Sequence, residues 1–102
     1  MKVVEITEIE FKDKIKREGK VLVDCYAPWC GPCKLLSPII DELAMETDDC
    51  EFYKLNIDES EVISTEYRIM SIPTILLFDH GKLKQKLIGF KTKEELKNII
   101  GE

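Results

Sequence analysis

The sequence predicts an α/β fold: a mixed five-stranded sheet flanked by four helices, in the order β-α-β-α-β-α-β-β-α. Apolar strand patterns alternate with helical patterns along the first part of the chain, which favours parallel strands joined by right-handed helical crossovers. Two strand patterns then follow each other across the turn 79–82, as in an antiparallel hairpin. Helices that alternate with strands in this way cover both faces of the sheet.

Composition indicates one small domain over residues 1–102. The chain carries 15 Lys and Arg against 20 Asp and Glu, a formal charge of −5, so we expect no nucleic-acid partner, which would normally show a basic patch. No apolar run approaches the roughly 18 residues of a membrane span, so we expect no membrane association. Four cysteines without a secretory signal pattern favour a reducing compartment. We therefore expect a cytoplasmic protein, acting as a monomer and without a bound cofactor.

The first elements are a short strand and a helix. Residues 2–6 form the predicted strand. Thr7 is the expected N-cap of the helix, because Glu10 three residues later completes a capping box. This helix is predicted to run to about Glu18.

A central strand and a long helix come next. Residues 21–27 are apolar on both faces except at Asp24, a pattern typical of a strand covered on both sides. After a turn at 28–31, apolar residues with a 3.6-residue period predict a helix to about Glu46. Pro38 lies inside this helix and should kink it, since proline lacks an N–H and crowds the preceding turn.

The remaining elements are a third strand, a short helix, the two strands of the hairpin and a last helix. The first four of these are predicted at 51–57, 60–69, 75–78 and 83–90. Thr92 is expected to cap the last helix, with Glu95 as its capping partner.

The most informative motif follows the central strand and opens the long helix; it reads Trp29-Cys30-Gly31-Pro32-Cys33. Residues three apart on a helix are neighbours, with Cβ atoms roughly 5–6 Å apart, and a disulfide needs Cα atoms about 4.4–6.8 Å apart. Cys30 and Cys33 can therefore form and break a disulfide with little change in the backbone.

The helix N-terminus makes the two cysteines unequal. Its free N–H groups and positive dipole end stabilise an anion, so the pKa of Cys30 should fall and its thiolate should be the nucleophile. Cys33 lies one turn deeper and should stay a thiol until it is needed. Pro32 suits the first helical turn, where its missing N–H costs nothing, and Gly31 lets backbone or substrate approach closely.

Asp24 is the second informative residue. An ionised carboxylate in an apolar environment is costly, so its pKa should rise unless it is paired. Strand alternation places Asp24 on the face that the long helix would cover, beneath the cysteines, where we expect it to act as general acid and base for Cys33. Lys54 is the natural charge partner on the next strand. Alternatively, Asp24 and Lys54 form only a buried ion pair.

Ile72 and Pro73 stand immediately before the first strand of the hairpin. Proline is tolerated at the first residue of a strand. If the Ile72–Pro73 bond is cis, it presents a backbone edge beside the cysteines, where a peptide substrate could pair as an added strand.

Five features together identify a family: the run 23–34, the helix with Pro38, the run 54–58, the run 71–74 and the late Gly89. They resemble the thioredoxin family over essentially the whole chain. The resemblance implies a thioredoxin fold and a thiol-disulfide oxidoreductase that reduces protein disulfides through transient mixed disulfides. It also implies a thioredoxin reductase as the partner that recharges it.

The resemblance implies a role for each matching residue. Cys30 would be the nucleophile and Cys33 the resolving thiol of a Cys30–Cys33 redox disulfide. Asp24 would be the buried acid and Lys54 its partner. The substrate-facing rim beside the motif would be formed by Trp29, Gly31, Pro32, Ile72, Pro73 and Gly89.

The chain departs from the family pattern in two places. Cys25 and Tyr26 stand where the family usually has aromatic residues, so the central strand carries less bulk at Cys25. Arg68 and Met70 replace a glycine and a basic residue that are common in the segment before the proline. Both changes leave the redox motif intact and bear on the choice of partner.

The two cysteines of the motif could instead be half of a structural zinc site. Such a site needs two more ligands, for which the candidates are Cys25, Cys50 and His80. Cys25 is expected on the strand face opposite Asp24, and the chain has no second Cys-x-x-Cys, so we expect no metal. Cys25 then reads as a small buried hydrophobic residue.

Two other functions remain open on the same fold. A disulfide oxidase or isomerase would use the same cysteine pair, but oxidising relatives usually carry a histidine between the cysteines, whereas Gly31 and Pro32 resemble the reducing members. A non-catalytic binding module is the second alternative. Retention of both cysteines and of Asp24 argues against binding as the only role.

Overall fold

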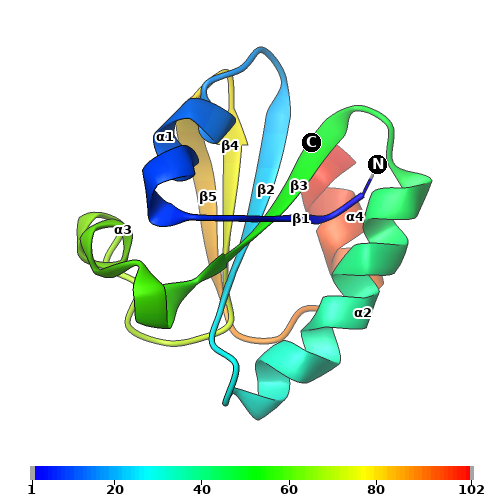
Figure 1. Ribbon diagram of the computed structural model, residues 1–102. Helices are drawn as coiled ribbons and strands as arrows, with labels where there is room; N and C mark the ends of the chain where they lie inside the picture. The colour runs from blue at the N-terminus through cyan, green and yellow to red at the C-terminus, as the bar shows by residue number, and fades with distance from the viewer. Residues whose placement is uncertain (1, 102) are drawn as a thin grey trace.

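The computed structural model describes residues 2–101 and confirms the predicted architecture (Figure 1). The sheet is built from β1 (Val4–Ile6), β2 (Lys20–Tyr26), β3 (Cys50–Asn56), β4 (Thr74–Asp79) and β5 (Lys82–Ile88). The helices are α1 (Glu8–Ile15), α2 (Gly31–Glu46), α3 (Glu61–Glu66) and α4 (Lys93–Gly101), with a 3₁₀ turn, η1 (Ile57–Glu59), before α3. Residues 1 and 102 of the predicted domain lie outside the described part of the chain.

The strands form one mixed sheet in the order β1-β3-β2-β4-β5. Strand β3 pairs in parallel with β1 and β2, whereas β4 pairs antiparallel with β2 and β5. The predicted parallel crossovers and late hairpin are therefore both present. Strand β2 is central, so its C-terminal end delivers the chain into the cysteine motif from the most buried part of the sheet.

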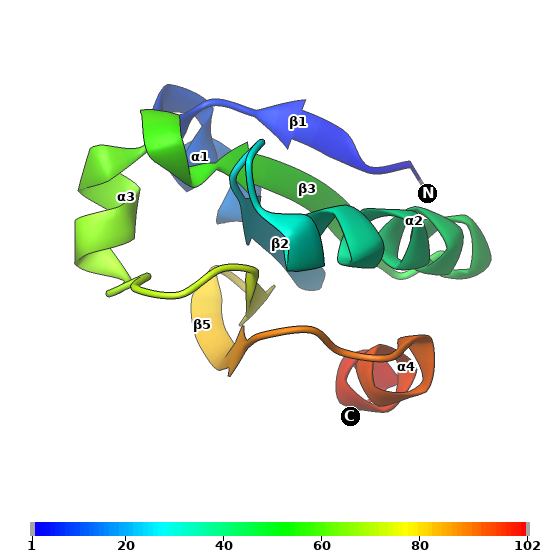
Figure 2. The ribbon, with the colours of Figure 1, turned by 90° about the horizontal axis from the view of Figure 1, so that it is seen from below.

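Helices cover the two faces of the sheet in pairs, α1 with α3 and α2 with α4, as Figure 2 shows. Side chains of β2 alternate between two apolar clusters: Val23 and Cys25 pack toward α1 and α3, and Leu22 packs toward α2 and α4. By the same alternation, Asp24 faces α2. No helix in residues 2–101 has the length and apolar character needed to cross a bilayer.

Two helices are shorter than the sequence predicts. Helix α1 ends at Ile15 instead of about Glu18, because Ile15 is the last residue of this stretch that the core buries. The short helix predicted at 60–69 is confined to α3. It ends where Arg68 takes a left-handed backbone conformation with φ of 52°, which an α-helix cannot continue through.

Strand boundaries differ by smaller amounts. The hairpin turns over two residues, His80 and Gly81, both with positive φ, so β5 begins one residue before the predicted strand. It ends at Ile88 instead of Phe90, because Gly89 has a φ of 90°. The loop after β5 therefore leaves the sheet at Gly89.

Candidate functional site

The two cysteines of the motif are joined by a disulfide, with their Cα atoms 5.3 Å apart. Cys30 is the N-cap of α2, and Cys33 lies in the first helical turn. The Cys33 backbone N–H donates a hydrogen bond to Cys30 Sγ at 3.2 Å. The helix N-terminus thus places one of its free N–H groups directly on the sulfur that the sequence predicts to be the nucleophile.

Local backbone hydrogen bonds hold this loop. The Cys30 N–H donates to the Ala27 carbonyl at 3.1 Å, and the Lys34 N–H donates to the Cys30 carbonyl at 3.2 Å. Pro32 occupies the first turn, where no N–H is required. The chain therefore passes from β2 into α2 with Cys30 held at the junction.

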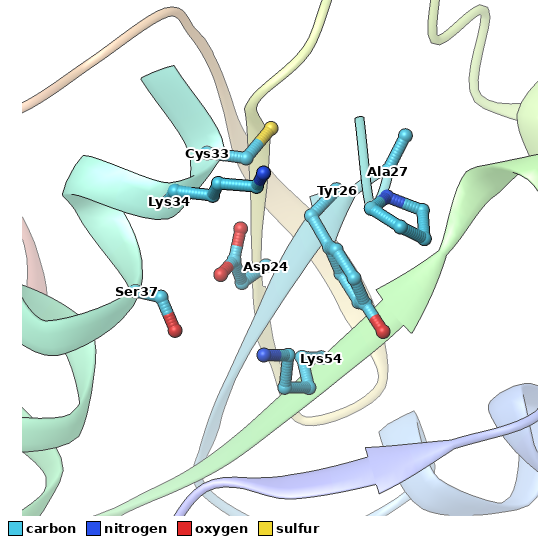
Figure 3. A pocket seen from close by; sticks show the side chains of 8 residues that line it. Asp24, Tyr26, Ala27, Cys33, Lys34, Ser37 and Lys54 are labelled. Atoms are coloured by element: carbon cyan, nitrogen blue, oxygen red, sulfur yellow. The ribbon is translucent and has the colours of Figure 1, made fainter. Parts of the chain in front are cut away.

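Asp24 lies beneath the motif and is only 2% exposed. Its carboxyl borders a cavity of about 130 Å³ that Cys33 also lines (Figure 3). Burial raises the pKa of Asp24 to about 7; the Lys54 charge opposes this rise, and Asp41 and Glu5 add to it. A carboxyl with such a pKa exchanges its proton near neutral pH, as a general acid and base must.

Lys54 stands beside Asp24 but forms no ion pair with it among the described residues. The two residues are direct neighbours in the β2–β3 register. The Lys54 ammonium lies 4.5 Å from the centre of the Tyr26 ring, a cation–π arrangement. Lys54 is thus a charged neighbour of Asp24, and its charge opposes the rise in the pKa of that carboxyl.

Trp29 lies on the surface next to Cys30, with 69% of its area exposed. Its indole N–H donates to Asp58 Oδ2 at 2.8 Å. Asp58 follows β3 in η1, and its own backbone N–H donates to Asn56 Oδ1 at 3.0 Å. The sequence pattern indicates no separate role for Asp58, although this residue belongs to the run 54–58 that carries part of the family resemblance.

The Ile72–Pro73 peptide bond is cis, and the segment before β4 lies beside the disulfide. The Ile72 carbonyl oxygen lies 3.8 Å from Cys30 Sγ. The Gly89 N–H donates to the Pro73 carbonyl at 2.8 Å. Ile72, Pro73 and Gly89, far apart from Cys30 in sequence, thus lie at one rim.

Gly31 and Pro32 complete this rim and are both exposed. A Cβ placed on Gly31 would meet no atom of the protein within 4 Å. The space beside Gly31 is therefore open. Met70, one of the departures from the family pattern, is also exposed.

The other two cysteines lie away from the motif. Cys25 and Cys50 are free and buried. Burial raises the pKa of Cys50 to about 12, with the Asp49 charge adding to the rise, and it raises the pKa of Cys25 as well. Within residues 2–101, no three His, Cys, Asp or Glu side chains come together where they could hold a metal ion.

A cysteine pair at a helix N-terminus, above a buried carboxyl and next to the end of the central strand of a five-stranded sheet, is the arrangement of a thiol-disulfide oxidoreductase. The family model described as thioredoxin matches residues 2–102. The chain belongs to the thioredoxin family.

Individual relatives agree with this assignment. The chain is 46% identical to a thioredoxin of Mycoplasmoides gallisepticum over 91 residues, which cover 89% of this chain and 91% of the relative. It is 40% identical to a thioredoxin of Staphylococcus epidermidis over 101 residues, covering 98% and 96% of the two chains. A solved mutant thioredoxin of Halobacterium salinarum matches with a TM-score of 0.90 at 31% identity, covering 97% of this chain and 88% of the other.

Proposed function

We propose that this protein reduces protein disulfides, with Cys30 as the nucleophile and Cys33 as the resolving thiol. One observation carries the assignment of roles: the two sulfurs face different surroundings. Cys30 Sγ accepts a hydrogen bond from the Cys33 N–H and lies 3.8 Å from the Ile72 carbonyl oxygen at the rim. Cys33, in contrast, lines the cavity that Asp24 borders. The outer sulfur is placed to meet a target, and the inner one is placed to exchange a proton.

The first step is attack on the target. In the reduced protein the Cys30 thiolate attacks one sulfur of a target disulfide. The target S–S bond breaks, its other sulfur leaves as a thiolate and takes a proton from water, and a mixed disulfide joins Cys30 to the target. Donors at the helix N-terminus stabilise the attacking thiolate before the reaction.

The second step releases the target. The Cys33 S–H bond breaks, its proton passes to the Asp24 carboxylate, and the resulting thiolate attacks Cys30 Sγ. The mixed disulfide breaks, the second target sulfur leaves as a thiolate, and the Cys30–Cys33 disulfide forms. Two electrons have then moved from the cysteine pair to the target, and Lys54 biases the charge of Asp24 while the proton moves.

The rim supplies contact area for the target chain. Trp29 is held in place by Asp58, and the Gly89 N–H holds the Pro73 carbonyl. Ile72 lies against the cysteine pair, and the open surface at Gly31 and Pro32 admits a target backbone. A small apolar rim of this kind suits brief encounters with several proteins rather than one tight complex.

The oxidised protein must be recharged. A thioredoxin reductase returns two electrons to the Cys30–Cys33 disulfide, and it reaches the pair at the same rim as the targets do. A reductase of protein disulfides works where reducing equivalents are supplied, and the cytoplasm is such a compartment. We place the protein there, acting as a monomer.

Trapping tests this function directly. A Cys33→Ser variant forms the mixed disulfide but cannot resolve it, so it should accumulate covalent complexes with several cellular proteins. The measurement is capture from a lysate, followed by release of the partners with a reducing agent. The Cys30→Ser variant is the matched control and should capture none by this route. Recovery of a single non-covalent partner with both variants would indicate a binding module instead.

A further inference from the structure

One buried polar atom of the site has no hydrogen-bond partner among the described residues: Asp24 Oδ1. Buried carboxyl oxygens in folded proteins nearly always accept hydrogen bonds from protein or water. The cavity of about 130 Å³ next to Asp24 has room for water molecules, which fill about 30 Å³ each in the liquid. A donor that reaches this cavity would therefore control the charge of Asp24.

Ser37 is such a donor. It follows Cys33 by four residues on α2, one helical turn along the same face, and it lines the same cavity. Figure 3 shows Ser37 and Lys54 on two sides of the Asp24 carboxyl. Ser37 is half-buried.

The Ser37 hydroxyl is also available. A serine inside a helix often bonds back to the carbonyl one turn earlier. No such bond, and no other hydrogen bond of this hydroxyl, is present within the described residues. Asp24 lacks a donor and Ser37 lacks an acceptor, and the two face one cavity from β2 and α2.

We propose that Ser37 is a positioning residue for proton transfer: through water in the cavity, its hydroxyl donates a hydrogen bond to the Asp24 carboxylate and keeps it ready to take the proton of Cys33. This inference rests on the proposed role of Asp24 as the base. In the step itself, the proton leaves Cys33 Sγ and ends on the Asp24 carboxyl, and the electron pair of the broken S–H bond stays on Cys33. Ser37 keeps its own proton throughout.

Other groups also act on Asp24, and a test must leave them unchanged. The charged and titratable groups that face it are Lys54 from β3, Glu5 from β1, Cys33, Lys34 and Asp41 from α2, and Tyr26 and Cys25 from its own strand. A Ser37→Ala substitution alters none of these. It also adds a residue of higher helix propensity, so the variant should fold.

The experiment follows release of the mixed disulfide against pH by rapid mixing, in Ser37→Ala, Ser37→Thr and the unmodified protein. Loss of one hydrogen bond to the Asp24 carboxylate should raise the midpoint of the pH dependence of release by about half a pH unit to one pH unit. Release at pH 7 should then be about two- to five-fold slower. Ser37→Thr keeps the hydroxyl and should restore the original midpoint. In an Asp24→Asn background, Ser37→Ala should have no effect.

The outcomes distinguish the role of Ser37 from that of Asp24. A midpoint that stays in place in Ser37→Ala while Asp24→Asn removes the titration overturns the role of Ser37 and leaves that of Asp24 intact. The same shift in the Asp24→Asn background also overturns it, because Ser37 would then act on another group. A profile unchanged by Asp24→Asn overturns both the role of Ser37 and the proposed base. A carbon NMR titration of the Asp24 carboxyl should show the same shift in the resting protein.

Discussion

A Cys30→Ser variant loses disulfide reduction almost completely, by roughly a thousand-fold or more, as expected when the nucleophile of a covalent mechanism is removed. A serine hydroxyl at the N-cap of α2 would still accept the Cys33 N–H, so the fold should be retained. Serine has no sulfur and therefore provides no thiolate, so no mixed disulfide can begin at this position. The measurement is the reduction of insulin disulfides with a dithiol as the electron supply.

The matched control for this variant is Cys50→Ala. Cys50 is as buried as Cys30, but it lies at the start of β3, away from the motif. This control should keep full turnover at temperatures where it remains folded. Retained turnover in Cys30→Ser would contradict the assignment of the nucleophile.

The Asp24→Asn substitution should separate the two halves of the reaction. Attack on the target uses the Cys30 thiolate and should change less than about two-fold, since Asp24 takes no proton in that step. Release of the target requires Cys33 to lose its proton, and removal of the general base that accepts it should slow release on the order of 10- to 100-fold at pH 7 to 8. Rapid-mixing kinetics that resolve the two steps would test this; equal slowing of both steps would mean that Asp24 has only a structural role.

The same substitution should also change the dependence of stability on pH. The pKa of Asp24 is about 7 in the folded protein against an ordinary value of 3.8, so between these two values the folded state holds a proton that the unfolded state has lost. Stability therefore falls as pH rises through this window, by on the order of 4 kcal/mol in all, and stays low above it. Asp24→Asn should stabilise the protein at pH 8 and have little effect at pH 4, as measured by chemical denaturation.

Much of the fold follows from local patterns. The capping box at Thr7 and Glu10 forms as the sequence predicts, because it depends on residues only three apart. The position of Cys30 and Cys33 at a helix start is likewise local. The sequence pattern predicts the ends of α1 and α3 too late in the chain, because these ends depend on where the core stops burying side chains and on the backbone conformation at Arg68.

The site is harder to predict wherever side chains from distant elements meet. The sequence predicts Lys54 as the charge partner of Asp24, but its spacing does not predict that the Lys54 ammonium also lies over the Tyr26 ring. The contact between Trp29 and Asp58 joins a loop to η1. The proposed role of Ser37 depends on the unpartnered oxygen of Asp24 across the cavity. A serine within a helix does not indicate such a role by itself.

The proposed mechanism requires that Cys30 ionises more readily than Cys33, and a titration of the thiols in the reduced protein measures this difference. Thiolate formation can be followed by ultraviolet absorbance against pH, with the Cys33→Ser variant isolating Cys30 and Cys30→Ser isolating Cys33. Since the N-terminus of α2 stabilises an anion at Cys30, its thiol should ionise well below the value of about 8.5 for free cysteine, and Cys33 should ionise above Cys30. A Cys30 thiol that ionises no more readily than free cysteine would show that the N-terminus of α2 does not activate the nucleophile.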